Sequence, residues 1–141
     1  KLSSTEGHQL ALSSPFFATR LQRIDDKLMQ MKRAIKNKEF QLLGELVEAE
    51  ALEFHSILLT SQPPQLLLEP GTVSVMQQVQ KLRQRGIPVY FTVNTGFNIH
   101  VLTLPEFTQQ VLSSVKNLKE VQKVILSSVG DGPKFLKKHL F

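Results

Sequence analysis

Two stretches in the first half of the chain repeat hydrophobic residues at steps of three or four, the period of an amphipathic helix. The first follows Ser14-Pro15, a good helix start because serine can cap the first turn and proline presets φ. It comprises Phe17, Leu21, Ile24, Leu28, Met31 and Ile35, and the second comprises Phe40, Leu43, Val47, Ala51, Phe54 and Leu58. Together they predict a helical hairpin that turns near Asn37 and ends at Pro63-Pro64.

The second half of the chain mixes helix and strand patterns. A third helix is predicted by Val75, Met76, Val79 and Leu82, and Gly86 can end it in a left-handed conformation. Residues 87–93 alternate as in a half-buried strand, and residues 99–104 predict its partner. Pro105 opens another helix, with an inner face of Phe107, Val111, Val115 and Leu118. The β-branched stretch 121–129 predicts one more strand, and Gly130-Asp131-Gly132-Pro133 a turn.

Helices segregated from a few antiparallel strands predict an α+β fold, arranged as a two-layer sandwich. With 141 residues and 41% hydrophobic content, residues 1–141 can form a single domain with a substantial core. The absence of cysteine excludes disulfides and thiolate metal sites and permits a reducing compartment, and we expect a cytoplasmic location. No hydrophobic run approaches the ~20 residues of a membrane helix, so we expect no membrane partner.

The net charge of +5 admits an anionic small molecule or a nucleic acid as partner, although scattered Lys and Arg are more typical of a solvated surface. Only Lys134, Lys137 and Lys138 cluster. The chain has one Tyr and no Trp, and no aromatic residues alternate with a basic stripe. Because single-stranded nucleic acids are bound by stacking on aromatic side chains, the composition argues against a nucleic-acid partner.

A polar hairpin tip between the two predicted strands is the strongest candidate site. It presents Asn94, Thr95, Gly96 and Asn98. Asparagine offers donors and acceptors, and glycine lets a backbone approach a ligand closely. Spacing alone leaves two interpretations open, a binding site or an ordinary loop that connects two strands.

The tip sequence, Tyr90-Phe91-Thr92-Val93-Asn94-Thr95-Gly96-Phe97-Asn98, resembles the Y-T-F-D-A-G-P-N motif of mevalonate diphosphate decarboxylases, in the GHMP kinase superfamily. Three further blocks resemble that family in order: Ser3-Ser4-Thr5-Glu6-Gly7-His8 its S-S-T-x-G-M, Ser14–Arg20 its T-S-P-x-x-x-x-R, and Glu53-Phe54-His55 with Pro63-Pro64 its Q-F-H-A and P-P. The four blocks cover essentially the whole chain.

This resemblance implies a ferredoxin-like GHMP kinase C-terminal domain, the substrate-side part of a larger two-domain enzyme. The N-terminal ATP-binding domain, absent from this chain, would be its partner and would bind most of the ATP and Mg²⁺. The implied reaction converts 5-diphosphomevalonate to isopentenyl diphosphate with release of ADP, phosphate and CO₂. We expect the 141-residue chain alone to be inactive, and a homodimer is a further prediction.

The resemblance also implies the site residues. Asn94 stands where the family has an Asp that orients or deprotonates the tertiary hydroxyl of the substrate, and an amide cannot accept that proton. Three explanations stay open: catalysis by positioning, a sister reaction, or lost activity. Substrate binding is assigned to Ser3, Ser4, Thr5, Thr95, Gly96 and Asn98. For Ser3, Ser4 and Thr5, an ordinary polar loop or a helix cap is the alternative.

Two other groups of residues are given structural roles. Arg20 is expected to be a surface or structural side chain rather than a phosphate ligand. Glu48, Glu50, Glu53 and His55 crowd one helix, but a carboxylate-bridged metal pair needs a Glu-x-x-His motif on a second helix, and the sequence has none. We therefore predict no protein-bound metal.

Two other functions remain as alternatives to the decarboxylase. One is a GHMP kinase that phosphorylates a mevalonate derivative without decarboxylation. The other is a non-catalytic α+β module that binds anions or nucleic acid. Release of CO₂ separates the first alternative from the decarboxylase, and a steep salt dependence of DNA or RNA binding would identify the second.

Overall fold

The predicted helical hairpin forms as α2 (Phe17–Asn37) and α3 (Phe40–Leu59) of the computed structural model, which describes residues 4–135. Lys38 ends α2 in a left-handed conformation with φ of 57°, and its N–H bonds back to the carbonyls of Ala34 and Ile35. At the start of the hairpin, the hydroxyl of Ser14 accepts a hydrogen bond of 3.2 Å from the N–H of Phe16. The turn near Asn37 is therefore confirmed, while α2 itself begins at Phe17, with Phe16 rather than Ser14 at its N-cap.

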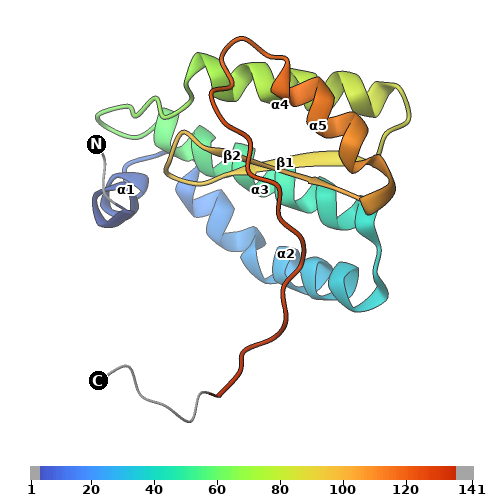
Figure 1. Ribbon diagram of the computed structural model, residues 1–141. Helices are drawn as coiled ribbons and strands as arrows, with labels where there is room; N and C mark the ends of the chain where they lie inside the picture. Colours follow the sequence, from blue (N-terminus) through green and yellow to red (C-terminus); the bar gives the residue numbers. More distant parts are fainter. Residues whose placement is uncertain (1–3, 136–141) are drawn as a thin grey trace.

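A two-stranded antiparallel ribbon lies between two groups of helices. β1 (Val89–Val93) pairs with β2 (Ile99–Thr103), with Val93 opposite Ile99, so that residues 94–98 form the tip. On one side lie α4 (Pro70–Gln84) and α5 (Thr108–Lys116), which follows a 3₁₀ turn, η1 (Pro105–Phe107), and on the other lie α3 and, beyond it, α2 (Figure 1). The predicted α+β class, helices packed on a small antiparallel sheet, is confirmed.

Both faces of β1 are buried, contrary to the half-buried strand that the alternation predicted. Val89, Phe91 and Val93 belong to the core formed with α4 and α5. On the opposite face Tyr90 is only 3% exposed, because its ring lies over Gly44 of α3. A Cβ on Gly44 would lie 2.1 Å from that ring, so glycine is required for the close approach of α3 to β1.

The strand predicted at 121–129 is wrong, since this segment has no regular secondary structure. Its residues are almost all exposed, and Val129 is fully so. A strand needs a free edge to pair with. The outer edge of β1 is occupied by the buried Glu48 of α3, whose carboxylate accepts a hydrogen bond of 3.1 Å from the N–H of Phe91. Within the described residues the ribbon has two strands.

Two further differences concern the helices. The sequence pattern did not predict α1 (Ser4–Ala11), a short helix that packs against α3. The hydrophobic stripe of α2 is only partly turned inward, because Leu21, Leu28 and Ile35 are more than half exposed. The other predicted boundaries hold: Gly86 has φ of 84° just after α4, and Pro105 begins η1. No helix among residues 4–135 is long and apolar enough to cross a membrane.

Candidate active site

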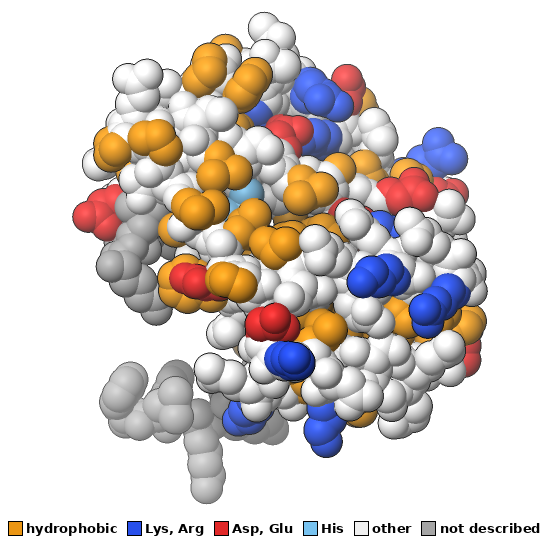
Figure 2. All heavy atoms as spheres, turned by 90° about the horizontal axis from the view of Figure 1, so that it is seen from above, with side chains coloured by type: hydrophobic (Ala, Val, Ile, Leu, Met, Phe, Trp, Pro, Cys, Tyr) orange, Lys and Arg blue, Asp and Glu red, His pale blue; other side chains and the backbone are white. Residues whose placement is uncertain are grey.

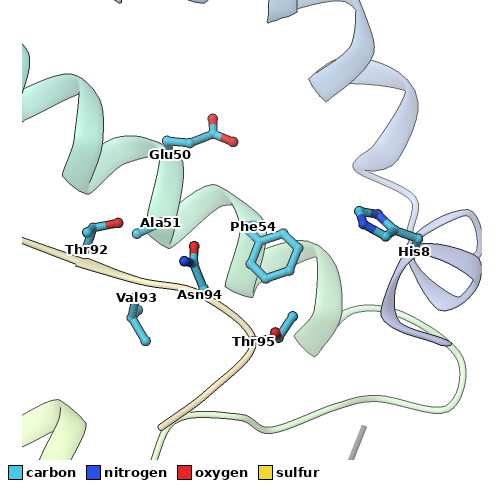
Figure 3. A pocket seen from close by; sticks show the side chains of 8 residues that line it. All are labelled: His8, Glu50, Ala51, Phe54, Thr92, Val93, Asn94 and Thr95. Carbon is cyan, nitrogen blue, oxygen red and sulfur yellow. The ribbon is translucent and has the colours of Figure 1, made fainter. Parts of the chain in front are cut away.

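A cavity of about 390 Å³ lies where α1, α3 and the end of β1 meet. Figure 3 shows the side chains that line it: His8, Glu50, Ala51, Phe54, Thr92, Val93, Asn94 and Thr95. α3 contributes one wall, the end of β1 the second, and the imidazole of His8, directed inward from α1, stands across from both (Figure 3). The cavity thus joins the block that contains His8 with the hairpin tip at Asn94, some 85 residues later in the chain.

Asn94 and Thr95, two of the predicted site residues, line this cavity. Val93 is the last residue of β1, so Asn94 continues the face of Tyr90 and Thr92, which is directed toward α3. Asn94 is exposed, and its amide is available to a molecule in the cavity. The predicted candidate site and the observed cavity therefore coincide at the first two residues of the tip.

Three of the other predicted site residues are not brought into the cavity. Thr5, Gly96 and Asn98 are absent from its lining. Ser4 begins α1, and Ser3 lies outside the described residues. An added Cβ on Gly96 would meet no described atom within 4 Å, and φ of Gly96 is not in the left-handed region. A left-handed turn therefore does not explain this glycine.

The tip is held in place from two directions. From α4, the buried Thr72 donates a hydrogen bond of 2.9 Å from its hydroxyl to the carbonyl of Phe97. From α3, the buried imidazole of His55 lies against the backbone of Val93 and Asn94. Burial lowers the pKa of His55, and hydrogen bonding with those two backbone groups raises it only in part. A neutral imidazole thus supports the backbone that carries Asn94.

The charged groups beside the cavity neutralise one another. Arg20 and Lys27 of α2 each pair with both Glu50 and Glu53 of α3, at 3.1 Å for Arg20 to Glu53 and 3.2 Å for Lys27 to Glu50. Burial raises the pKa of Glu50, but the hydrogen bonds from Arg20 and Lys27 outweigh it, so this pKa lies below its ordinary value. Glu50 is therefore an ionised, cation-paired carboxylate, and Arg20 has a structural role.

Sequence reasoning missed three of these residues as part of the site. His8, Phe54 and His55 were all inside the blocks compared with the family, yet none was assigned to the site. Two features of the sequence could have indicated them. His8 belongs to the same block as Ser3, Ser4 and Thr5, and Phe54 belongs to the hydrophobic stripe of α3. Among the described residues, no group of three or more His, Asp or Glu side chains could hold a metal ion.

Comparison with known proteins identifies the family of this chain. The family model for the mevalonate 5-diphosphate decarboxylase C-terminal domain matches residues 1–120. The phosphomevalonate decarboxylase of Haloferax volcanii is 28% identical over 111 residues, which cover 78% of this chain and 34% of that protein. The mevalonate pyrophosphate decarboxylase of Streptococcus pyogenes superposes with a TM-score of 0.85 at 31% identity, covering 96% of this chain and 42% of that one.

A third relative has been solved with ligands. The enzyme MDDEF, in complex with MVAPP, AMPPCP and magnesium, superposes with a TM-score of 0.78 at 33% identity, covering 84% of this chain and 37% of that one. The chain thus spans between about a third and two fifths of the length of these three relatives. The family match includes every helix and strand described above. This chain therefore belongs to the mevalonate 5-diphosphate decarboxylase C-terminal domain family.

Proposed function

We propose that this chain forms the substrate-side wall of an ATP-dependent decarboxylase that acts on a phosphorylated mevalonate. The observation that carries the proposal is the cavity in which Asn94 and Thr95 face α3 and α1. Membership in the decarboxylase family and the relative solved with MVAPP, AMPPCP and magnesium support it. A cytoplasmic location and a homodimer remain predictions.

Within this proposal Asn94 positions the substrate alcohol. Its amide can donate to the hydroxyl oxygen or accept from the hydroxyl proton, and so can hold the oxygen for attack on the γ-phosphate of ATP. Beside the amide of Asn94, Thr95 adds a hydroxyl to the same wall of the cavity. A positioned alcohol gains much of its rate from orientation alone, so an amide at residue 94 is compatible with turnover.

The phosphate groups of the substrate would be bound elsewhere. None of the described residues that line the cavity is Lys or Arg, and the nearby Arg20 and Lys27 are already paired with Glu50 and Glu53. A diphosphate is bound in proteins by free cations or backbone N–H groups. We therefore infer that a second part of the enzyme supplies the phosphate-binding residues and binds ATP with Mg²⁺, and that residues 1–141 form one domain of it.

The nucleic-acid alternative has little support on the face drawn in Figure 2. Among the described residues of that face, Lys and Arg side chains lie in small groups interspersed with acidic, hydrophobic and uncharged ones. Non-specific nucleic-acid binding needs a row of cations that follows the phosphate backbone. Figure 2 shows no such row on that face.

The test is an assay of the complete enzyme with ATP and Mg²⁺ against mevalonate 5-phosphate and mevalonate 5-diphosphate. We expect ADP, free phosphate and CO₂ in equal amounts with one of the two substrates. ADP without CO₂ would identify the kinase alternative. No ADP with either substrate would refute the proposal. The Asn94→Ala variant, which lacks the amide, is expected to lose at least tenfold in kcat/KM.

A further inference from the structure

We infer that the imidazole of His8 accepts the proton of the substrate alcohol, the proton that Asn94 cannot take. This inference rests on the proposed function and assigns a further catalytic residue to it. Phosphorylation of an alcohol must release a proton, because the O–H bond of the substrate is replaced by an O–P bond. The cavity must therefore contain, or lead to, a group that receives it.

His8 is the side chain in the cavity best suited to this task. Asn94, Thr92 and Thr95 have no basic group, and Ala51, Phe54 and Val93 are apolar. His8 is exposed, and it makes no hydrogen bond or ion pair with the other described residues. Its ring is directed from α1 into the cavity (Figure 3). Imidazole is the side chain whose ordinary pKa lies closest to neutral pH, where a general base is most effective.

Glu50 is the competing candidate, and its contacts count against it. Both of its carboxylate oxygens are hydrogen-bonded, one to Arg20 and the other to Lys27. These two cations favour the ionised form of Glu50, which therefore has little tendency to take up a proton. The same network fixes the carboxylate to α2 and leaves it less free to reach a substrate.

The charged groups around His8 are few. From α3 come Glu50 and Glu53, both paired with Arg20 and Lys27 of α2, and Glu6 lies on α1 itself. The end of β1 presents only neutral side chains. The paired charges of α2 and α3 near His8 therefore largely cancel.

The chemical step balances as follows. The hydroxyl oxygen of the substrate attacks the γ-phosphorus of ATP, the bond from that phosphorus to the bridging oxygen breaks, and ADP leaves. The hydroxyl proton passes to the imidazole of His8, directly or through one water molecule, and then to solvent. Asn94 holds the oxygen during the transfer. The sequence agrees with this division of roles. Asn94 stands where the Y-T-F-D-A-G-P-N motif has Asp, and His8 stands where the S-S-T-x-G-M motif has Met.

The experiment compares four forms of the complete enzyme: wild type, His8→Gln, Asn94→Asp and His8→Gln/Asn94→Asp. The dependence of kcat on pH is measured with saturating ATP, Mg²⁺ and substrate. We expect His8→Gln to lower kcat by about 10²–10⁴ at neutral pH, to leave KM within threefold, and to abolish the loss of rate that the wild type shows at acid pH. Asn94→Asp should restore at least tenfold in the His8→Gln background and much less in wild type.

His100→Gln is the matched control, since His100 is an exposed residue of β2 outside the cavity. It should leave kcat and the pH profile unchanged. A wild-type kcat and pH profile in His8→Gln would refute the role of His8 and leave the proposed function standing. Equal effects of Asn94→Asp in both backgrounds would refute it as well. A wild-type enzyme that releases no ADP would refute the proposed function, and this inference with it.

Discussion

The carboxylate of Glu48 accepts one hydrogen bond from each terminal nitrogen of the Arg83 guanidinium, at 2.8 and 2.9 Å. Arg83 also donates to the carbonyl of Val89 at 3.1 Å, and its guanidinium lies 4.8 Å from the centre of the Tyr90 ring. The pair therefore joins α3, α4 and β1 at one point. Because the cavity needs the end of β1 at a fixed distance from α3, this pair contributes to the geometry of the candidate site.

Glu48→Gln should destabilise the protein by about 2 kcal/mol, because it leaves the half-buried Arg83 guanidinium without its charged partner. Urea unfolding followed by circular dichroism measures the change. Glu106→Gln is the control: Glu106 is exposed and forms no ion pair with other described residues, so its variant should stay within about 0.5 kcal/mol of wild type. Equal midpoints for the two variants would contradict the prediction.

Gly44→Ala should also destabilise, by about 1–3 kcal/mol, because the new methyl group would overlap the Tyr90 ring and push α3 away from β1. The melting temperature reports this loss. Gly96→Ala serves as comparison, since a methyl group there meets nothing among the described atoms, and its melting temperature should be that of wild type. A lower melting temperature for Gly96→Ala than for Gly44→Ala would contradict the close contact between Gly44 of α3 and the Tyr90 ring of β1.

The buried His55 predicts a pH dependence of stability. Because its pKa in the folded protein is below the unfolded value, the unfolded chain binds more protons in that range. Stability should therefore be highest above the unfolded pKa of about 6.5 and should be lost as the pH falls below it. Unfolding free energies at pH 7.5 and 5.5 measure this loss. It should shrink in His55→Gln and persist in His100→Gln, whose wild-type residue is exposed.

Thr72→Val removes the hydroxyl that holds the tip at Phe97 while keeping the shape of the side chain. We expect a loss of about 1 kcal/mol in stability and, in the complete enzyme, a larger rise in KM than fall in kcat, because the tip loses a support but no reacting group. Thr19→Val, at an exposed residue of α2, is the control and should change neither parameter. A fall in kcat at unchanged KM would instead assign Thr72 to the reaction itself.

Much of the fold follows from patterns that are local in the sequence. The glycine after α4 and the strand around Phe91 each follow from a few neighbouring residues, and both were confirmed, although both faces of that strand are buried. The strand predicted at 121–129 failed because pairing depends on an edge elsewhere in the fold, which β-propensity does not contain. The burial of Tyr90 was also missed. Its ring packs on Gly44, which lies 46 residues earlier, so the local pattern does not contain this contact.

Asn94 and Thr95 could be predicted because the tip is one continuous stretch of sequence and resembles a family motif, and both residues line the cavity. His8 and Glu50 could not be found in this way. They meet the tip only through the packing of α1 against α3 and of α3 against β1, and no spacing rule connects residues so far apart. His55 was visible as a histidine next to an inner-facing phenylalanine, but its support of the Asn94 backbone depends on three-dimensional contact.

The extended segment after α5 has a consequence for handling the protein. Residues 124–129 read Val-Ile-Leu-Ser-Ser-Val, six positions without a charge, a proline or a glycine, and Ile125, Leu126 and Val129 are each more than 60% exposed. Short uncharged stretches of this composition stack between chains into cross-β fibrils. In concentrated solutions of the separate chain, aggregation would begin here, and a lysine at residue 125 would be the first substitution to improve solubility.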